Sequence, residues 1–426
     1  MTKKLVLIFF SGLLLFSVLS PIVGWAQQTS QIVSDKTQLV TAVEQKDTVF
    51  NQDQKQRLEQ ATKYQRTKHL LYFLGQGYGL VFLFLFCFLG ISARIRSKAE
   101  KITKLRFFVI ALFIVAFILI QFIISFPLDY YGFNLEHKFN LSNQTFGGWM
   151  GDYSKEFLLS LLLFLILFEG VYFLIKKSPK RWWIYVSAVF VLFTIVLVNL
   201  APILILPLFN VYTPLPQGEL RDKLVRLSER AKVRTEAIYT MDMSKQTEKV
   251  NAMFTGLGNT KRIVLGDNLV KHLNPNEVEV VIAHEMGHNI LQHIWRIIVL
   301  NAILATFGFL LIHLTMGRIV NRWKKSLKME SPSDIATLPL FLLIFMIYSL
   351  VIMPVMPGYS RILEQQADRF ALEITHNKGA FVSSMQKLVY LNLDDPNPSP
   401  VVEFLLYDHP ATGKRIKFAE EYKFKE

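Results

Sequence analysis

Six apolar runs constrain the fold of this chain more than any other feature of its sequence. Each is long enough to cross a hydrocarbon core, which needs about 20 residues in a helix. The bilayer core offers no water to unpaired backbone groups, so such runs fold as helices. The sequence therefore predicts a mainly α-helical, polytopic membrane bundle. The runs are Leu70 to Ala93, Phe107 to Phe126, Phe157 to Ile175, Trp182 to Leu206, Ile297 to Met316 and Ala336 to Pro357.

Composition supports this fold class and narrows the choice of partners. With 52% hydrophobic residues, 35 Phe and only 19% charged residues, the chain is too apolar for a soluble protein of 426 residues. The net charge of +14 comes without a basic run interleaved with stacking aromatics, so we expect a lipid bilayer as partner and no nucleic acid. The single cysteine, Cys87, excludes an internal disulfide.

The start of the chain has two interpretations. Residues 1–26 combine Lys3 and Lys4 with an apolar core and small residues near Gly24 and Ala26, as in a signal peptide. The same residues also suit a first transmembrane helix, which would be a seventh span. Residues 27–68 are polar, and we expect them to form an extramembrane segment.

The remaining chain divides into four parts by composition. We expect residues 69–206 to form an N-terminal membrane domain of four spans, and residues 207–296 a small α+β peptidase insert. Residues 297–357 would form a transmembrane hairpin, and residues 358–426 a C-terminal segment. Within these parts the patterns predict helices at Leu220 to Ala231, Ser360 to Lys378 and Ala380 to Leu393, strands at Ala237 to Met241 and Ile263 to Leu265, and an extended segment at Asn251 to Gly256.

The insert ends in a stretch with the chemistry of a metallopeptidase. His284 and His288 are four residues apart, so on a helix they present two imidazoles to one point, which is half of a tetrahedral zinc site. Glu285 can instead take a proton from the attacking water. Asn274 as cap, Pro275 at the first position and Glu277 three residues after the cap predict a helix start just before this motif.

A catalytic zinc needs a third protein ligand and one open position. Glu364 is the candidate, because it follows the last span and can return to the motif if the two preceding spans form a hairpin. Asp368 lies one helical turn later, where its carboxylate could accept a hydrogen bond from a ligand imidazole. We therefore expect one zinc ion per chain, bound by His284, His288 and Glu364.

Three alternatives compete with this interpretation. Two histidines at this spacing can occur by chance in a protein core. A transporter or receptor could carry a structural zinc site, but such a site has no use for a base at Glu285. An intramembrane site-2-type protease would place its motif within a span and use an aspartate as third ligand, whereas here the motif follows a polar insert.

The chain from about Pro127 onward resembles the integral-membrane zinc metallopeptidases of the CAAX prenyl protease 1 family. The matching segments occur in the same order as in that family. They are Glu136-His137, Asn143-Gln144-Thr145, Asp152, Pro207-Leu208-Phe209, Thr213-Pro214-Leu215-Pro216, Asn251-Ala252-Met253-Phe254-Thr255-Gly256, Lys261 to Leu265, the zinc motif, Glu364 with Ala367-Asp368, and His409-Pro410.

This resemblance implies a helical bundle that encloses a chamber, with a zinc peptidase site at one end. It also implies two roles that the residues alone would not indicate. Asn251 would hold the substrate backbone beside an edge strand, and His409 would stabilise the oxyanion of the tetrahedral intermediate. Nothing in the sequence reads as a prenyl-binding motif. We therefore expect a membrane zinc endopeptidase acting on a peptide or protein, with a role in membrane protein quality control, and keep prenylated CAAX peptides as the alternative substrate.

The basic residues predict the orientation. Three alternate loops are rich in Lys and Arg, and the positive-inside rule assigns them all to the cytoplasm. Both halves of the zinc site then lie on the opposite side, so we expect an extracytoplasmic active site in the plasma (inner) membrane. The sequence does not determine the oligomeric state. The basic residues are Arg94, Arg96, Lys98, Lys101, Lys104 and Arg106; Lys176, Lys177, Lys180 and Arg181; and Arg318, Arg322, Lys324, Lys325 and Lys328.

Overall fold

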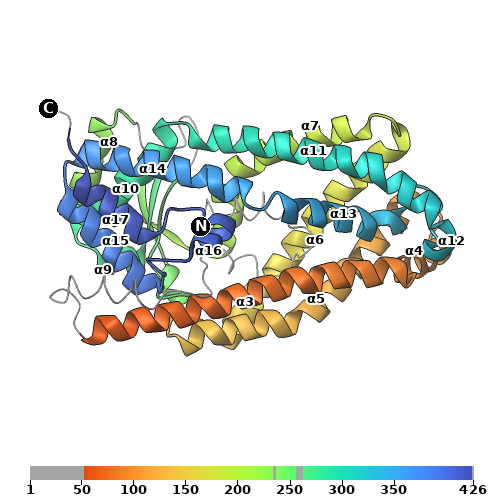
Figure 1. Ribbon diagram of the computed structural model, residues 1–426, viewed down its shortest axis with the longest axis horizontal. Helices are drawn as coiled ribbons and strands as arrows, with labels where there is room; N and C mark the ends of the chain where they lie inside the picture. Colours follow the sequence, from red (N-terminus) through yellow and green to blue (C-terminus); the bar gives the residue numbers. More distant parts are fainter. Residues whose placement is uncertain (1–51, 234–236, 256–261, 425–426) are drawn as a thin grey trace.

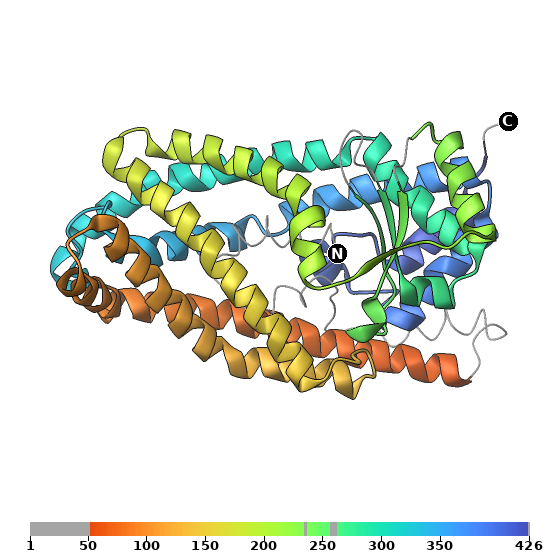
Figure 2. The ribbon, with the colours of Figure 1, turned by 180° about the vertical axis from the view of Figure 1, so that it is seen from behind.

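The computed structural model describes residues 52–233, 237–255 and 262–424. Long helices run along the molecule and a small sheet with shorter helices lies at one end (Figures 1 and 2). This confirms the predicted fold class, a polytopic helical bundle with a small α+β unit. The choice between a signal peptide and a first span concerns residues 1–26, which lie outside the described residues.

Among the described residues, five helices are long and apolar enough to cross a membrane. In each, only 33–39% of the most apolar window is buried inside the protein, so most of its surface faces outward, as lipid-facing helices require. They are α3 (Gln52–Phe88), α5 (Arg106–Lys138), α6 (Phe146–Lys177), α7 (Trp182–Leu200), which continues as a π-helical turn (Ala201–Ile205) and a 3-10 turn (Leu206–Leu208), and α11 (His293–Arg322).

Two of these helices differ from the sequence expectation at their ends. The run that starts at Leu70 was expected to reach Ala93, but α3 ends at Phe88 because Gly90 turns the chain with a φ of 68°, and α4 (Ile91–Ile102) follows. Conversely, Pro127 does not end α5, which continues to Lys138. Membrane helices tolerate an internal proline because neighbouring groups can satisfy the backbone carbonyl that loses its hydrogen bond.

The last apolar run forms a bent pair of helices. α13 (Leu338–Val351) and α14 (Val355–Thr375) meet at an angle of 49°, and together they would make a sixth span. Pro354 lies at the bend, where it cannot donate a backbone hydrogen bond to a continuous helix. A short helix α12 (Lys324–Leu327) and a 3-10 turn (Ile335–Thr337) connect α11 to α13.

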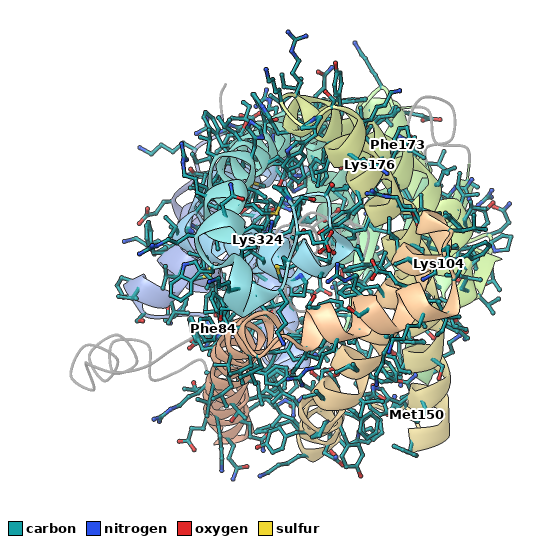
Figure 3. All side chains as sticks on the ribbon, turned by 90° about the vertical axis from the view of Figure 1, so that its right-hand side faces the viewer. Phe84, Lys104, Met150, Phe173, Lys176 and Lys324 are labelled. Carbon is teal, nitrogen blue, oxygen red and sulfur yellow. The ribbon has the colours of Figure 1, made fainter. Side chains whose placement is uncertain are left out.

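The end of the bundle away from the sheet is basic. Figure 3 looks at this end, with Lys104, Lys176 and Lys324 labelled on it. Lys104 lies between α4 and α5, Lys176 in the last turn of α6, and Lys324 at the start of α12. The three loops that the sequence grouped by charge therefore meet at one end.

The opposite end contains the sheet. Its strand order is β1-β2-β4-β3, with β2 and β4 parallel in the centre and β1 and β3 antiparallel at the edges. The predicted strand at Ala237 to Met241 is confirmed with the same bounds. The elements are β1 (Tyr212–Pro214), α8 (Glu219–Arg230), β2 (Ala237–Met241), a 3-10 turn (Met243–Lys245), β3 (Ala252–Thr255), β4 (Arg262–Gly266), α9 (Asp267–His272) and α10 (Pro275–Ile290).

The C-terminal helices complete the core around this sheet. α10 buries Val278, Ile282 and Met286 against residues of α14 and α15, in a core distinct from the aromatic-rich core of the membrane bundle. Their helical spacing places these three residues in one apolar stripe along the motif helix. The last helices are α15 (Lys378–Asn392), α16 (Pro400–Leu406) and α17 (Thr412–Glu421).

Candidate metal centre

The helix that carries the two histidines begins as the sequence predicts. The Asn274 side chain accepts hydrogen bonds from the backbone N–H groups of Asn276 and Glu277, and the Glu277 carboxylate accepts one from Asn274 at 2.8 Å. Pro275 occupies the first helical position. This reciprocal capping satisfies donors that the first turn would otherwise leave unpaired, so the start of α10 is fixed.

A glycine inside the motif lets α10 and α14 approach closely. A Cβ built on Gly287 would lie 3.1 Å from Phe370 Cδ1 and 3.3 Å from Ala367 Cα. Because the Ala367 contact is with backbone, a side chain at position 287 would push α14 away. Gly287 therefore sets the helix separation at which Glu364, one turn before Ala367, reaches the histidines.

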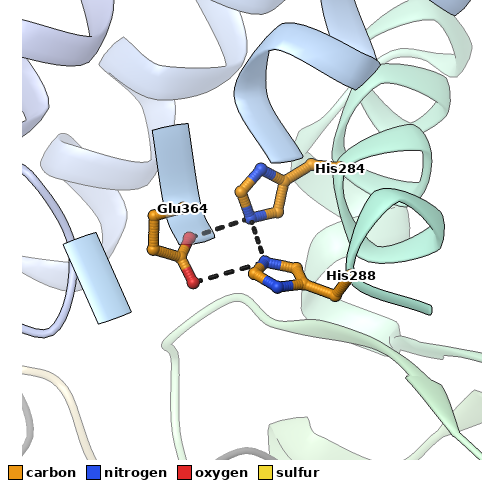
Figure 4. A group of neighbouring side chains, drawn as sticks. All are labelled: His284, His288 and Glu364. Atoms are coloured by element: carbon orange, nitrogen blue, oxygen red, sulfur yellow. Dashed lines mark hydrogen bonds and ion pairs between the residues drawn. The ribbon is translucent and has the colours of Figure 1, made fainter. Parts of the chain in front are cut away.

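Three side chains converge where the two helices meet (Figure 4). His284 Nε2 lies 3.0 Å from Glu364 Oε2, His288 Nε2 lies 3.3 Å from Glu364 Oε1, and the two Nε2 atoms are 3.1 Å apart. The side chains are almost fully buried, at 6%, 5% and 1% exposure for His284, His288 and Glu364. Three electron-pair donors this close repel unless a proton or a cation lies among them, so this donor set fits a metal ion.

Asp368 lies against the first of these histidines. Its Oδ1 atom is 2.9 Å from His284 Nδ1, which is the contact that the sequence suggested. Asp368 is held in turn by Arg415 of α17, whose Nε donates to Oδ2 at 2.8 Å. Burial disfavours the charged imidazole, but Glu364 and Asp368 outweigh it and raise the pKa of His284 above its ordinary value. Protons will therefore compete with a metal for this ligand as the pH falls.

His409 also reaches the cluster. Its Nε2 atom lies 3.2 Å from Glu364 Oε2, and its Nδ1 lies 2.7 Å from Asp408 Oδ1. The side chain is 38% exposed, so one side of this ring remains accessible to a substrate. Arg361 holds the loop in place, because its Nη1 donates to the carbonyl oxygens of Glu403 and Tyr407 at 2.6 Å each.

The other two predicted site residues are Glu285, on α10, and Asn251, next to β3. Glu285 follows His284 on α10 and is half-buried. Burial lowers the pKa of Arg415, but Asp368, with smaller contributions from Glu364 and Glu285, outweighs burial and raises it. Asn251 directly precedes the edge strand β3, and its carbonyl oxygen accepts a hydrogen bond from Gly266 N–H at 2.9 Å. A Cβ at Gly266 would lie 2.9 Å from this oxygen, so only glycine allows the contact.

Sequence reasoning missed four residues around the centre. Arg415 contacts Asp368, which lies 47 residues earlier in the sequence. Arg361 contacts the carbonyl oxygen of Tyr407, which lies 46 residues later. His293 and Gln366 lie behind His288. Of these, only His293 had a signal, since it is a third histidine shortly after the motif.

Comparisons with known proteins find two family matches that divide the chain between them. The profile of peptidase family M48 matches residues 214–423, and that of the CAAX prenyl protease N-terminal region, described as five membrane helices, matches residues 36–211. The chain is 31% identical to the uncharacterized metalloprotease YhfN of Bacillus subtilis over 361 residues, 85% of each chain.

Two further relatives carry the prenyl protease name. CAAX prenyl protease 1 of Saccharomyces cerevisiae is 29% identical over 318 residues, which cover 69% of this chain and 68% of that protein. The crystal structure of S. mikatae Ste24p shares the fold with a TM-score of 0.76 at 21% identity, over 98% of this chain and 97% of that one. These matches confirm the resemblance seen in the sequence: the chain belongs to peptidase family M48, and it is an integral-membrane metalloprotease of the CAAX prenyl protease type.

Proposed function

We propose that this protein is a zinc endopeptidase whose metal is held by His284, His288 and Glu364. The observation that carries the proposal is the convergence of the two Nε2 atoms and the Glu364 carboxylate within 3.3 Å, in a buried site that offers nitrogen and oxygen ligands. Two imidazoles and one carboxylate are a ligand set of catalytic zinc, and they leave a fourth position open. Asp368 fixes the orientation of His284.

The surrounding residues supply the other parts of a hydrolytic site. Bound zinc would polarise the scissile carbonyl and lower the pKa of water. Glu285 takes a proton from the attacking water and passes it to the departing amine. His409 donates a hydrogen bond to the carbonyl oxygen as negative charge develops there. Asn251, at the start of the edge strand β3, holds the substrate backbone in an extended form.

His409 gives this proposal a specific test. Replacing it with phenylalanine removes the donor while keeping a planar ring in the loop, so turnover should fall by roughly a hundredfold with the metal content unchanged. Hydrolysis rates and bound metal, measured on the same detergent preparations, check this. Normal turnover in the variant would show that His409 has only a structural role in its loop.

We also propose that the site faces away from the cytoplasm, in the plasma (inner) membrane. The basic loops lie at one end of the bundle and the sheet with α10 at the other, which supports opposite sides of a bilayer (Figures 1 and 3). By the positive-inside rule the basic end is cytoplasmic. In this proposal residues 207–296 form an extracytoplasmic peptidase insert, and residues 358–426 return the third ligand to it.

Single cysteines distinguish the two orientations. Ser244 is exposed near the sheet and Ser326 is exposed in α12 at the basic end. With Cys87, which is buried, replaced by serine, a membrane-impermeant thiol reagent on intact cells should label cysteine at 244 and not at 326. Both positions should become labelled after lysis, which serves as the control. Labelling of 326 alone in intact cells would reverse the orientation.

The orientation bears on the substrate. An extracytoplasmic site would act on exported or membrane-embedded chains, and we propose a role in membrane protein quality control. The relatives named CAAX prenyl proteases favour the alternative, cleavage of prenylated C-terminal peptides. A cytosolic site in the labelling experiment would make that alternative the better proposal.

A further inference from the structure

We propose that His293 is a positioning residue, which fixes the tautomer and the ring orientation of His288. The inference deepens the proposed function, since it rests on His288 being a metal ligand. His293 is the first residue of α11 and is fully buried, at 0% exposure. Its Nδ1 lies 2.9 Å from His288 Nδ1, and its Nε2 lies 3.1 Å from Gln366 Oε1.

The direction of each hydrogen bond follows from Arg296, the last residue in this series of contacts. Arg296 donates through Nη1 to Gln366 at 3.2 Å, and a guanidinium can only donate, so Gln366 must present its carbonyl oxygen there. The same oxygen faces His293 Nε2, which must therefore carry a proton and donate it. Neutral His293 then has its lone pair on Nδ1.

That lone pair determines the state of His288. With an acceptor at His293 Nδ1, the proton of neutral His288 belongs on Nδ1, and Nε2 is left with the lone pair that faces His284 and Glu364. This is the tautomer in which Nε2 can bind a metal. The contact at Nδ1 also resists rotation of the His288 ring, whose plane is tilted by 76° from that of His293.

The arrangement differs from that behind the other histidine ligand. His284 has the carboxylate of Asp368 behind it, paired with Arg415, whereas His288 has an imidazole behind it, followed by the amide of Gln366. His293 and Gln366 also join three elements, since they lie on α11 and α14 and contact a ligand on α10. The first residue of a membrane-spanning helix thus orients a metal ligand.

Metal retention tests this role without relying on activity. The full chain is purified in detergent as wild type, His293→Leu, His293→Asn and, as control, His313→Leu, which removes a histidine from the same helix, near Trp182 and Trp183. Each preparation is dialysed against increasing concentrations of a zinc chelator, and the remaining zinc is measured. His293→Leu should lose half its zinc at a chelator concentration roughly tenfold to a hundredfold lower than wild type.

The asparagine variant separates hydrogen bonding from packing. Its amide oxygen can take the place of the Nδ1 acceptor, so His293→Asn should recover most of the lost retention, and His313→Leu should match wild type. With Co²⁺ in place of zinc, the visible absorption bands should shift in His293→Leu and return in His293→Asn. If His293→Leu fails to fold, Gln366→Met removes the second acceptor and should show the same loss.

Two results would overturn the proposal. Equal zinc retention in His293→Leu and wild type would remove the positioning role, and so would equal losses in the leucine and asparagine variants. Failure of the proposed function looks different, because wild type itself would then hold no zinc and His288→Ala would change nothing.

Discussion

Replacing Glu285 with glutamine is expected to lower peptide hydrolysis by roughly a thousandfold or more while the metal stays bound. Glutamine fills the same space but cannot take a proton from water at neutral pH. Glu285 is next to His284 in sequence, and on a helix adjacent residues point in different directions, so its loss should leave the three ligands undisturbed. Rates and bound metal in purified wild type and variant measure both effects.

A matched control lies on the same helix. Glu279 forms ion pairs with Arg230 and Lys223 on the side of α10 that faces α8, so Glu279→Gln removes a carboxylate without touching the metal ligands. We expect this variant to keep both its metal and its turnover. If Glu285→Gln hydrolysed peptides as fast as wild type, Glu285 could not be the base.

Replacing Glu364 with alanine is expected to abolish both metal binding and hydrolysis. The side chain contributes the only carboxylate among the three converging ligands, and two imidazoles alone bind zinc far more weakly. Loss of Glu364 also leaves His409 without the oxygen that it contacts at 3.2 Å. Metal analysis after dialysis should find the variant nearly empty.

The control for this change is another glutamate of α14. Glu373 contacts the hydroxyl of Tyr422 and lies away from the cluster, so Glu373→Ala should retain its metal. His288→Ala should behave like Glu364→Ala, because each removes one corner of the site. Full metal content in Glu364→Ala would require a different third ligand.

The sequence was informative where local rules govern the structure. The capping box at Asn274, the strand from Ala237 to Met241 and the apolar stripe of α10 all follow from patterns within a few residues, and all are present. The pairing of Glu364 with the histidines could also be inferred, because a hairpin of spans leaves few places for a returning chain.

What the sequence could not show depends on contacts between distant segments. Nothing around Arg415 indicates that it pairs with Asp368, and nothing around Arg361 indicates that it holds the His409 loop. The first apolar run was predicted to reach Ala93, but α3 ends at Phe88. The sequence does not distinguish Gly90, which has a φ of 68°, from a glycine inside a continuous membrane helix. The apolar run that ends at Phe126 likewise did not indicate that α5 continues through Pro127 to Lys138.

We expect peptide hydrolysis by this protein to depend on a metal bound at His284, His288 and Glu364. The most direct measurement is hydrolysis of a peptide by purified wild type before chelation, after removal of the metal, and after addition of zinc, with metal content determined at each step. We expect about one zinc per chain, loss of hydrolysis when it is removed, and recovery when it returns. Hydrolysis that continues in the metal-free chain would contradict this expectation.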